Sequence, residues 1–142
     1  MEMLYYLGAK ALICNDKGEV LTLHITNGEK SYWDFPGGRI NRSEDIEKAL
    51  KREVQEETGI TDVVIGECLG TELTSVQIPV PGDHPRGLIL TVYTCTAPVL
   101  SEIVTEPNMR AEWCTPQEAI ARNSKFSESM RQRILAALQP AG

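Results

Sequence analysis

The chain has 142 residues, 42% of them hydrophobic, which favours one domain with a sizeable core over residues 1–142. Its net charge of −6 argues against non-specific binding to polymeric nucleic acid. No apolar run reaches membrane-spanning length, and the N-terminus lacks the basic segment of a signal peptide. We therefore expect a cytoplasmic protein that has no membrane partner.

The first third of the chain predicts strands followed by a glycine-rich turn. The strands are expected at residues 4–13, 19–25 and 32–35. Asn15-Asp16-Lys17-Gly18 favours a turn between the first two strands, and residues 26–31 favour a polar loop. Pro36-Gly37-Gly38 then predicts a turn in which missing side chains let the backbone approach a ligand.

A helix is predicted at residues 45–58, with one buried face. Its apolar positions recur every four residues, at Ile46, Leu50 and Val54, with Ala49 beside them. Ser43 is expected to be the N-cap, because a serine hydroxyl can accept a hydrogen bond from a backbone N–H of the first turn. Gly59 is expected to end the helix in the left-handed conformation.

The second half of the chain predicts further strands and two short helices. The strands are expected at residues 63–70, 71–78, 88–97 and 111–114. The proline-rich segment 79–87 predicts a loop, and 98–109 is expected to be irregular. A capping box at 115–118 starts one helix, and residues 127–138 form the last. Helices on both faces of a mixed sheet predict an α/β fold, a three-layer α/β/α sandwich.

The four cysteines are widely spaced, and none belongs to a Cys-x-x-Cys pair. This pattern argues against a zinc site or a disulfide framework. Because each cysteine falls in or beside a predicted strand, we expect buried, reduced thiols at Cys14, Cys68, Cys95 and Cys114.

Three glutamates, Glu53, Glu56 and Glu57, fall within one turn of the predicted helix. They share a helix face and repel one another, which favours a positive partner. Carboxylates are hard oxygen ligands that suit Mg²⁺, Mn²⁺ or Ca²⁺ rather than zinc. A solvated charged face is the ordinary alternative. It is disfavoured because Glu53 and Glu57 border the apolar stripe, where a carboxylate needs a partner.

Arg52 is expected to organise these carboxylates. It can reach Glu56 one helical turn ahead. It can also reach back to Glu44, which would fix the preceding loop to the helix. This arrangement would leave Glu53 and Glu57 free for metal.

Residues 38–60 resemble the Nudix box, the signature of the Nudix hydrolases. Gly38 is followed after five residues by Glu44, and after seven more by Arg-Glu-Val-x-Glu-Glu-x-Gly-Ile, which matches every fixed position. The segment that leads into the box, Phe35-Pro36-Gly37-Gly38, is also similar to the family. The resemblance implies the Nudix fold. It also implies metal-dependent hydrolysis of a pyrophosphate bond in a nucleoside diphosphate linked to another moiety.

The resemblance also implies roles for individual residues. The metal ligands carried over by position are the Gly38 carbonyl, Glu53, Glu56 and Glu57. They would hold Mg²⁺, with Mn²⁺ as a substitute. The catalytic set is Glu53, Glu57 and Arg52, and the choice of general base between the two glutamates stays open. Glu44 and Gly37 would support the site.

Residues outside the box are further candidates for the site. Trp33 and Phe35 flank the platform and are candidates to stack on a base, with a place in the core as the common alternative. Arg39 follows the glycine turn and is a candidate phosphate contact, with solvated surface as the alternative. Many Nudix enzymes add a carboxylate from outside the box; the candidates here are Glu102, Glu106 and Glu112.

Small single-domain Nudix enzymes are often nucleoside triphosphate pyrophosphatases, so a (deoxy)nucleoside triphosphate is the first expectation. A nucleotide sugar or another nucleoside diphosphate derivative is the alternative. Ser75 and Val76 stand where the ADP-ribose group tends to place a proline. A sensor that binds a nucleotide without cleaving it is the alternative from another class, but such proteins commonly lose box glutamates. The sequence does not indicate an oligomeric state.

Overall fold

The structure is a computed structural model, which describes residues 2–97 and 103–138. Its elements, in chain order, are β1 (Tyr5–Cys14), β2 (Val20–Asn27), β3 (Lys30–Asp34), β4 (Gly37–Arg39), α1 (Ile46–Thr58), β5 (Val64–Ile78), β6 (Arg86–Thr96), β7 (Met109–Cys114), α2 (Pro116–Arg122) and α3 (Glu128–Leu138). Within these ranges, no helix has the length and apolar character needed to cross a membrane.

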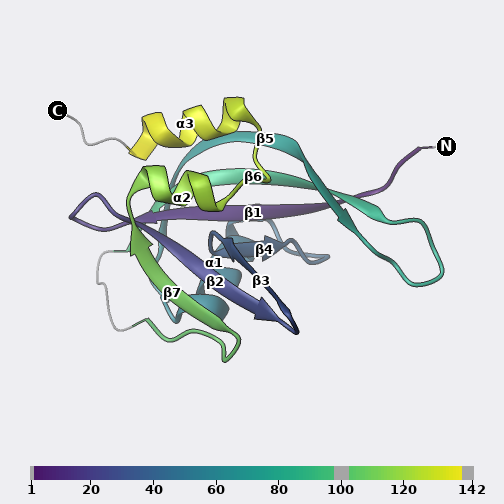
Figure 1. The fold of residues 1–142 in the computed structure, drawn as a ribbon, viewed down its shortest axis with the longest axis horizontal. Helices are drawn as coiled ribbons and strands as arrows, with labels where there is room; N and C mark the ends of the chain where they lie inside the picture. Colours follow the sequence, from purple (N-terminus) through teal and green to yellow (C-terminus); the bar gives the residue numbers. More distant parts are fainter. Residues whose placement is uncertain (1, 98–102, 139–142) are drawn as a thin grey trace.

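The strands form one mixed sheet, with β1 near its centre (Figure 1). β1 and β6 run parallel, and β5 lies antiparallel along the other edge of β6. The second edge of β1 pairs with β4 near its start and with β2 at its end. β2 in turn pairs with β3 and β7. The sheet is therefore mixed, as expected.

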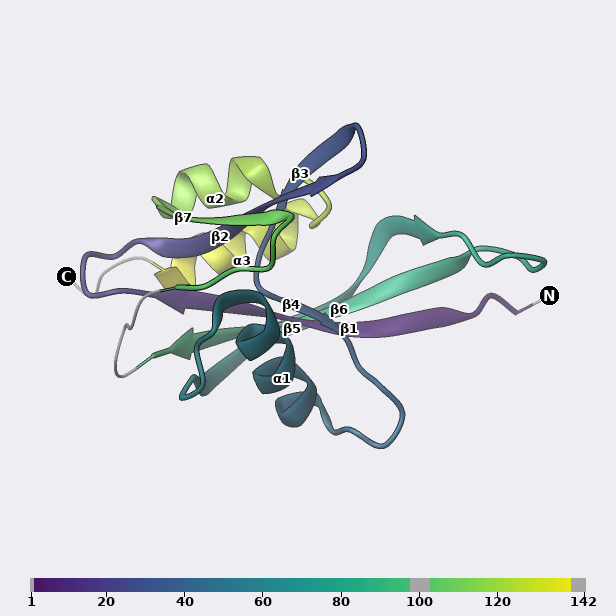
Figure 2. The same ribbon diagram turned by 90° about the horizontal axis from the view of Figure 1, so that it is seen from below.

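The side chains of β1 alternate between two cores, one on each face of the sheet. On one face, Ala9, Ala11 and Ile13 pack with Leu50 and Val54 of α1. On the other face, Leu12 belongs to a cluster that α2 and α3 complete, with Phe35, Phe126, Met130 and Ile134. Figure 2 shows α1 on one side of the sheet and the other two helices on the opposite side. The expected three-layer α/β/α arrangement is confirmed.

The ends of α1 are defined by Asp45 and Gly59. Asp45 is the N-cap, because its side chain accepts a hydrogen bond from the Lys48 N–H at 2.8 Å. The expectation that Ser43 caps the helix was wrong: Ser43 has φ 79° and belongs to the turn before the helix. Gly59 has φ 78° and confirms the left-handed C-cap.

Three segments differ from the predicted strands and loops. Residues 26–31 were expected to be a polar loop, but β2 extends to Asn27 and β3 begins at Lys30. Residues 64–78 form the single strand β5 rather than two strands. Shifts in register on either side of Gly70, which has φ 142°, absorb the irregularity without breaking the strand. Residues 37–39 form β4 rather than a turn. Gly37 permits this pairing, because a Cβ there would lie 2.1 Å from the Ala9 carbonyl oxygen.

The cysteines are free thiols, as expected, but they are not all buried. Cys95 and Cys114 are buried, and Cys14 is half-buried. Cys68 is exposed, so the expectation of a buried thiol there was wrong. It lies on β5, which among the described strands pairs only with β6.

Candidate active site

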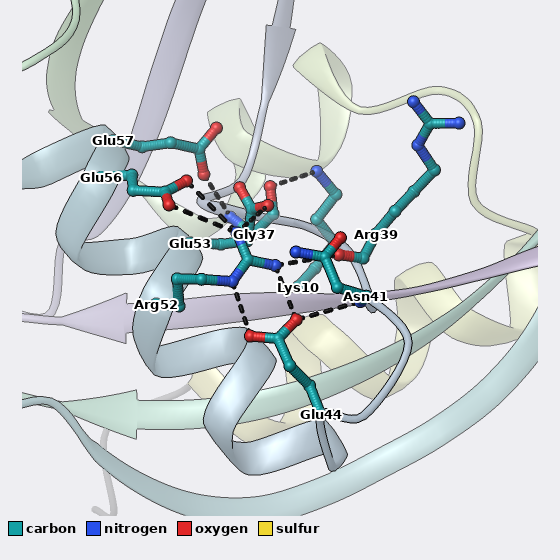
Figure 3. Close-up of polar contacts among 9 residues, drawn as sticks. All are labelled: Lys10, Gly37, Arg39, Asn41, Glu44, Arg52, Glu53, Glu56 and Glu57. Carbon is teal, nitrogen blue, oxygen red and sulfur yellow. Dashed lines mark hydrogen bonds and ion pairs between the residues drawn. The ribbon is translucent and has the colours of Figure 1, made fainter.

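The glutamates of α1 lie beside the β4 backbone, at the edge between the helix and the sheet (Figure 3). The Glu53 carboxylate packs against Gly38: a Cβ on Gly38 would come within 2.7 Å of Glu53 Oε2. Glycine at this position therefore leaves room for the carboxylate. Glu56 is exposed at the helix surface, whereas Glu57 is only 7% exposed. We call Gly37, Gly38, Glu53, Glu56 and Glu57 the platform.

Arg52 connects the carboxylates of the loop and the helix. Its Nε donates to Glu44 Oε2 at 2.6 Å and its Nη2 to Glu44 Oε1 at 2.9 Å, which confirms the expected link. This hydrogen bonding lowers the pKa of Glu44. Arg52 also reaches Glu56, at 3.3 Å, as expected. It is also bonded to Glu53 Oε1 at 2.9 Å, so the expectation that Glu53 stays free was wrong. The guanidinium group has five N–H donors and hydrogen-bonds to all three carboxylates.

Glu57 is held by the backbone of β4. Its Oε1 accepts a hydrogen bond from the Gly37 N–H at 2.7 Å. Burial raises the pKa of Glu57 to about 7, although the Gly37 hydrogen bond and the nearby Lys10 ammonium act to lower it. The carboxyl group therefore binds a proton more tightly than an exposed glutamate does.

A buried ion pair lies next to the platform, and the sequence did not predict it. Lys10 Nζ donates to Asp34 Oδ2 at 2.9 Å, and Lys125 donates to the other oxygen of the same carboxylate. Burial alone would raise the pKa of Asp34, but the two ammonium groups hold it below its usual range. The available signal was a lysine between Ala9 and Ala11 in an otherwise apolar strand.

A cavity of about 410 Å³ adjoins this ion pair, and we call it the side pocket. Its lining includes Lys10, Trp33, Asp34, Leu88, Asn123 and Lys125. The volume is in the range of small-molecule binding sites. Because Lys10 also contacts the Gly37 carbonyl, at 3.3 Å, the pocket lies next to the platform.

The two aromatic candidates occupy different environments. Phe35 is fully buried and packs against Phe126, with ring centroids 6.1 Å apart. Its proposed stacking on a ligand was wrong, because the ring fills the core between the sheet and α3. Trp33 is half-buried and lines the side pocket. The Arg122 guanidinium already lies over its ring, 3.9 Å from the centroid.

The remaining charged candidates lie outside the platform. Arg39 is exposed and points away from the platform glutamates, with its guanidinium 4.5 Å from the Tyr6 ring centroid (Figure 3). Of the extra carboxylates, Glu102 falls outside the described residues. Glu106 is exposed in the turn before β7, and Glu112 bonds to Arg122 at 2.8 Å. A role for any of the three in the site stays a prediction.

The donor set of the platform suits a hard divalent cation by its chemistry. Every expected ligand is a carboxylate or carbonyl oxygen, the ligand type that Mg²⁺ and Mn²⁺ prefer. Within residues 2–97 and 103–138, no three acidic, histidine or cysteine side chains already surround one point. Glu53 and Glu56 share Arg52, and Glu57 holds Gly37. Metal binding must therefore compete with Arg52 for Glu53 and Glu56.

Comparisons with known proteins agree with the observed fold. The model of the NUDIX domain family matches residues 4–136. A MutT-like protein of Streptomyces ambofaciens is 28% identical over 139 residues, covering 98% of this chain and 80% of that protein. An 8-oxo-dGTP diphosphatase of Buchnera aphidicola is 50% identical over 40 residues, or 27% of this chain and 32% of its own length. The crystal structure of a MutT protein from Methanosarcina mazei Go1 is 27% identical, with a TM-score of 0.69, covering 94% of this chain and 93% of that one.

Together with the fold, the family match defines a hydrolase of phosphorus anhydride bonds. The chain belongs to the Nudix family. It acts on nucleoside diphosphate-linked substrates, and Nudix hydrolases generally need divalent metal ions.

The raised pKa of Glu57 predicts how the stability of the metal-free protein depends on pH. The folded state holds the Glu57 proton up to about pH 7, whereas the unfolded chain releases it near the ordinary value of 4.5. The contribution to stability is complete below pH 4.5 and is lost as the pH rises to about 7. The loss is on the order of 3 kcal/mol. Denaturant unfolding in EDTA from pH 5 to 8 measures it. The Glu57→Gln variant should lack this decrease, and an identical pH dependence in both proteins would contradict the assignment.

Proposed function

We propose that the protein is a Mg²⁺-dependent pyrophosphatase of (deoxy)nucleoside triphosphates, releasing a nucleoside monophosphate and pyrophosphate. The observation that carries the proposal is the side pocket of about 410 Å³ next to a platform of hard oxygen ligands. A diphosphate group at the platform places the attached nucleoside within reach of this pocket. Mn²⁺ is expected to substitute for Mg²⁺, since it accepts the same ligand type.

The platform residues are proposed to have two roles, metal binding and proton transfer. The Gly38 carbonyl, Glu53, Glu56 and Glu57 would hold the divalent ion. Such an ion would supply positive charge against the diphosphate and would lower the pKa of a bound water. A platform carboxylate, Glu53 or Glu57, accepts a proton from the water that attacks phosphorus in line. Arg52 keeps Glu53 and Glu56 close together, and through Glu44 it ties the preceding loop to α1.

Two contacts are proposed for the parts of the substrate beyond the diphosphate. Trp33 and Tyr32 both line the side pocket, and Trp33 is proposed to stack on a base there. Arg39 directly follows the Gly38 carbonyl and is proposed to meet a phosphate that extends beyond the platform. The Buchnera relative is named for a nucleoside triphosphate, which supports the same substrate class.

Two alternatives compete with this proposal. A nucleotide sugar or another nucleoside diphosphate derivative would use the same platform with a different group beyond it. A sensor would bind the nucleotide without cleaving it. The complete set of box glutamates favours an enzyme over a sensor.

Hydrolysis of a nucleotide panel in heavy-oxygen water tests the proposal. The panel contains the nucleoside triphosphates, nucleotide sugars and dinucleoside polyphosphates, each with Mg²⁺ and with EDTA. We expect a nucleoside monophosphate from the triphosphates, with the label in one of the two phosphate products by mass spectrometry. Preferential cleavage of a nucleotide sugar would favour the first alternative. Tight binding by calorimetry without any product would favour the sensor.

A further inference from the structure

Lys10 is a buried lysine in the central strand, on the same face as Leu12. It is only 7% exposed, and a buried ammonium group is costly unless its hydrogens are bonded. Its three hydrogens match three acceptors: Asp34 Oδ2 at 2.9 Å, the Phe35 carbonyl at 3.4 Å and the Gly37 carbonyl at 3.3 Å. Two of these acceptors belong to the backbone that leads into the platform.

The peptide groups of Gly37 are thereby held from two sides (Figure 3). Lys10 bonds the carbonyl oxygen, and Glu57 bonds the N–H at 2.7 Å. The next residue, Gly38, lies against the Glu53 carboxylate. The backbone at Gly37 and Gly38 therefore contacts both Glu57 and Glu53, the two glutamates that the proposed mechanism needs.

The position of the Lys10 ammonium group is itself fixed by Asp34. Asp34 Oδ1 accepts the Phe35 N–H at 2.8 Å and a hydrogen bond from Lys125. The carboxylate therefore has a defined orientation when its Oδ2 meets Lys10.

We propose that Lys10 is a positioning residue for hydrolysis: it fixes the Gly37 peptide so that Glu57 and the Gly38 carbonyl bind the same metal ion. This inference rests on the proposed function, because it assumes that the platform binds a divalent ion. If Lys10 is removed, its charge and its positioning role predict opposite changes in the affinity for a cation. Loss of a nearby positive charge by itself would strengthen cation binding. Loss of a fixed ligand geometry would weaken it.

The Lys10→Met variant tests this proposal, because methionine keeps an unbranched apolar stem and removes the ammonium group. We expect the Mg²⁺ concentration for half-maximal activity to rise about 10-fold, the scale of lost hydrogen bonds to the two carbonyls. We expect kcat to fall about 10-fold or more, with the nucleotide KM changed by less than about threefold. Calorimetric titration of the nucleotide-free protein with Mn²⁺ should show the same weakening.

A second variant and a control separate positioning from loss of stability. Lys10→Met leaves the Asp34 carboxylate paired with the Lys125 ammonium, so the remaining buried charges balance. Lys125→Met removes the other ammonium group and keeps the contacts of Lys10 to the Phe35 and Gly37 carbonyls. It should lower thermal stability without weakening Mn²⁺ binding to the nucleotide-free protein. Thr91→Val alters another buried residue, on β6, whose hydroxyl contacts the Gly70 carbonyl at 3.5 Å. It should change stability without changing the Mg²⁺ requirement.

Tighter or unchanged metal binding in folded Lys10→Met would overturn the proposal, whatever the effect on kcat. So would an equal weakening of Mn²⁺ binding in Lys125→Met. If the wild-type protein cleaves no nucleoside triphosphate, the proposed function fails by itself. The Mn²⁺ titration then still decides the role of Lys10.

Discussion

Replacing Glu57 by glutamine should lower turnover by at least about 10²-fold and leave the fold intact. The amide oxygen of glutamine can still accept the Gly37 N–H, which Glu57 accepts at 2.7 Å, so the local structure has a substitute acceptor. The negative charge needed for metal binding or proton transfer is lost. Steady-state kinetics at saturating Mg²⁺, with circular dichroism of the same sample, measures the effect.

Glu47→Gln is the matched control for this substitution. Glu47 lies in the first turn of the same helix, α1, and is exposed. The same chemical change there should leave turnover within about twofold of the wild type. If Glu57→Gln keeps a near-normal rate while Glu44→Gln is inactive, the ligand and supporting roles that we assign are inverted.

Removal of divalent metal should abolish hydrolysis, and Mg²⁺ or Mn²⁺ should restore it. The platform offers only oxygen ligands. The chain also carries a net charge of −6, so it repels phosphorylated substrates unless a cation screens them. Nucleotide affinity measured by calorimetry should therefore rise sharply when Ca²⁺ or Mg²⁺ is added.

Full turnover in EDTA would rule out the metal-dependent mechanism. Circular dichroism in EDTA provides the control, because it shows whether the chain stays folded when activity is lost. A non-catalytic sensor would show the same metal-dependent binding. Cleavage must therefore be assayed on the sample used for calorimetry.

The box helix was predictable because its determinants are local. The four-residue spacing of Leu50 and Val54 sets the buried face of α1, and Gly59 ends the helix as expected. The link from Arg52 to Glu44 also follows from the sequence, since one residue lies on the helix and the other in the loop just before it. The layers of the fold followed from the order of predicted strands and helices.

The features that the sequence did not predict depend on contacts between distant segments. β4 forms because Gly37 can approach the backbone of β1, which no local pattern indicates. Phe35 is in the core because Phe126 packs against it from the other end of the chain. The pairing of Lys10 with Asp34 joins residues on strands that are not adjacent in the sheet. A lysine at this position in the sequence gives no indication of its partner.

The hydrogen bond between the Gly37 N–H and Glu57 makes this amide a spectroscopic probe of the site. An amide proton that donates to a charged carboxylate forms a shorter, stronger hydrogen bond than one that donates to a neutral group. Its resonance in a nitrogen-15-labelled sample should therefore follow the state of Glu57. A single backbone signal would then report the arrival of a proton or a cation at the platform before any substrate is added.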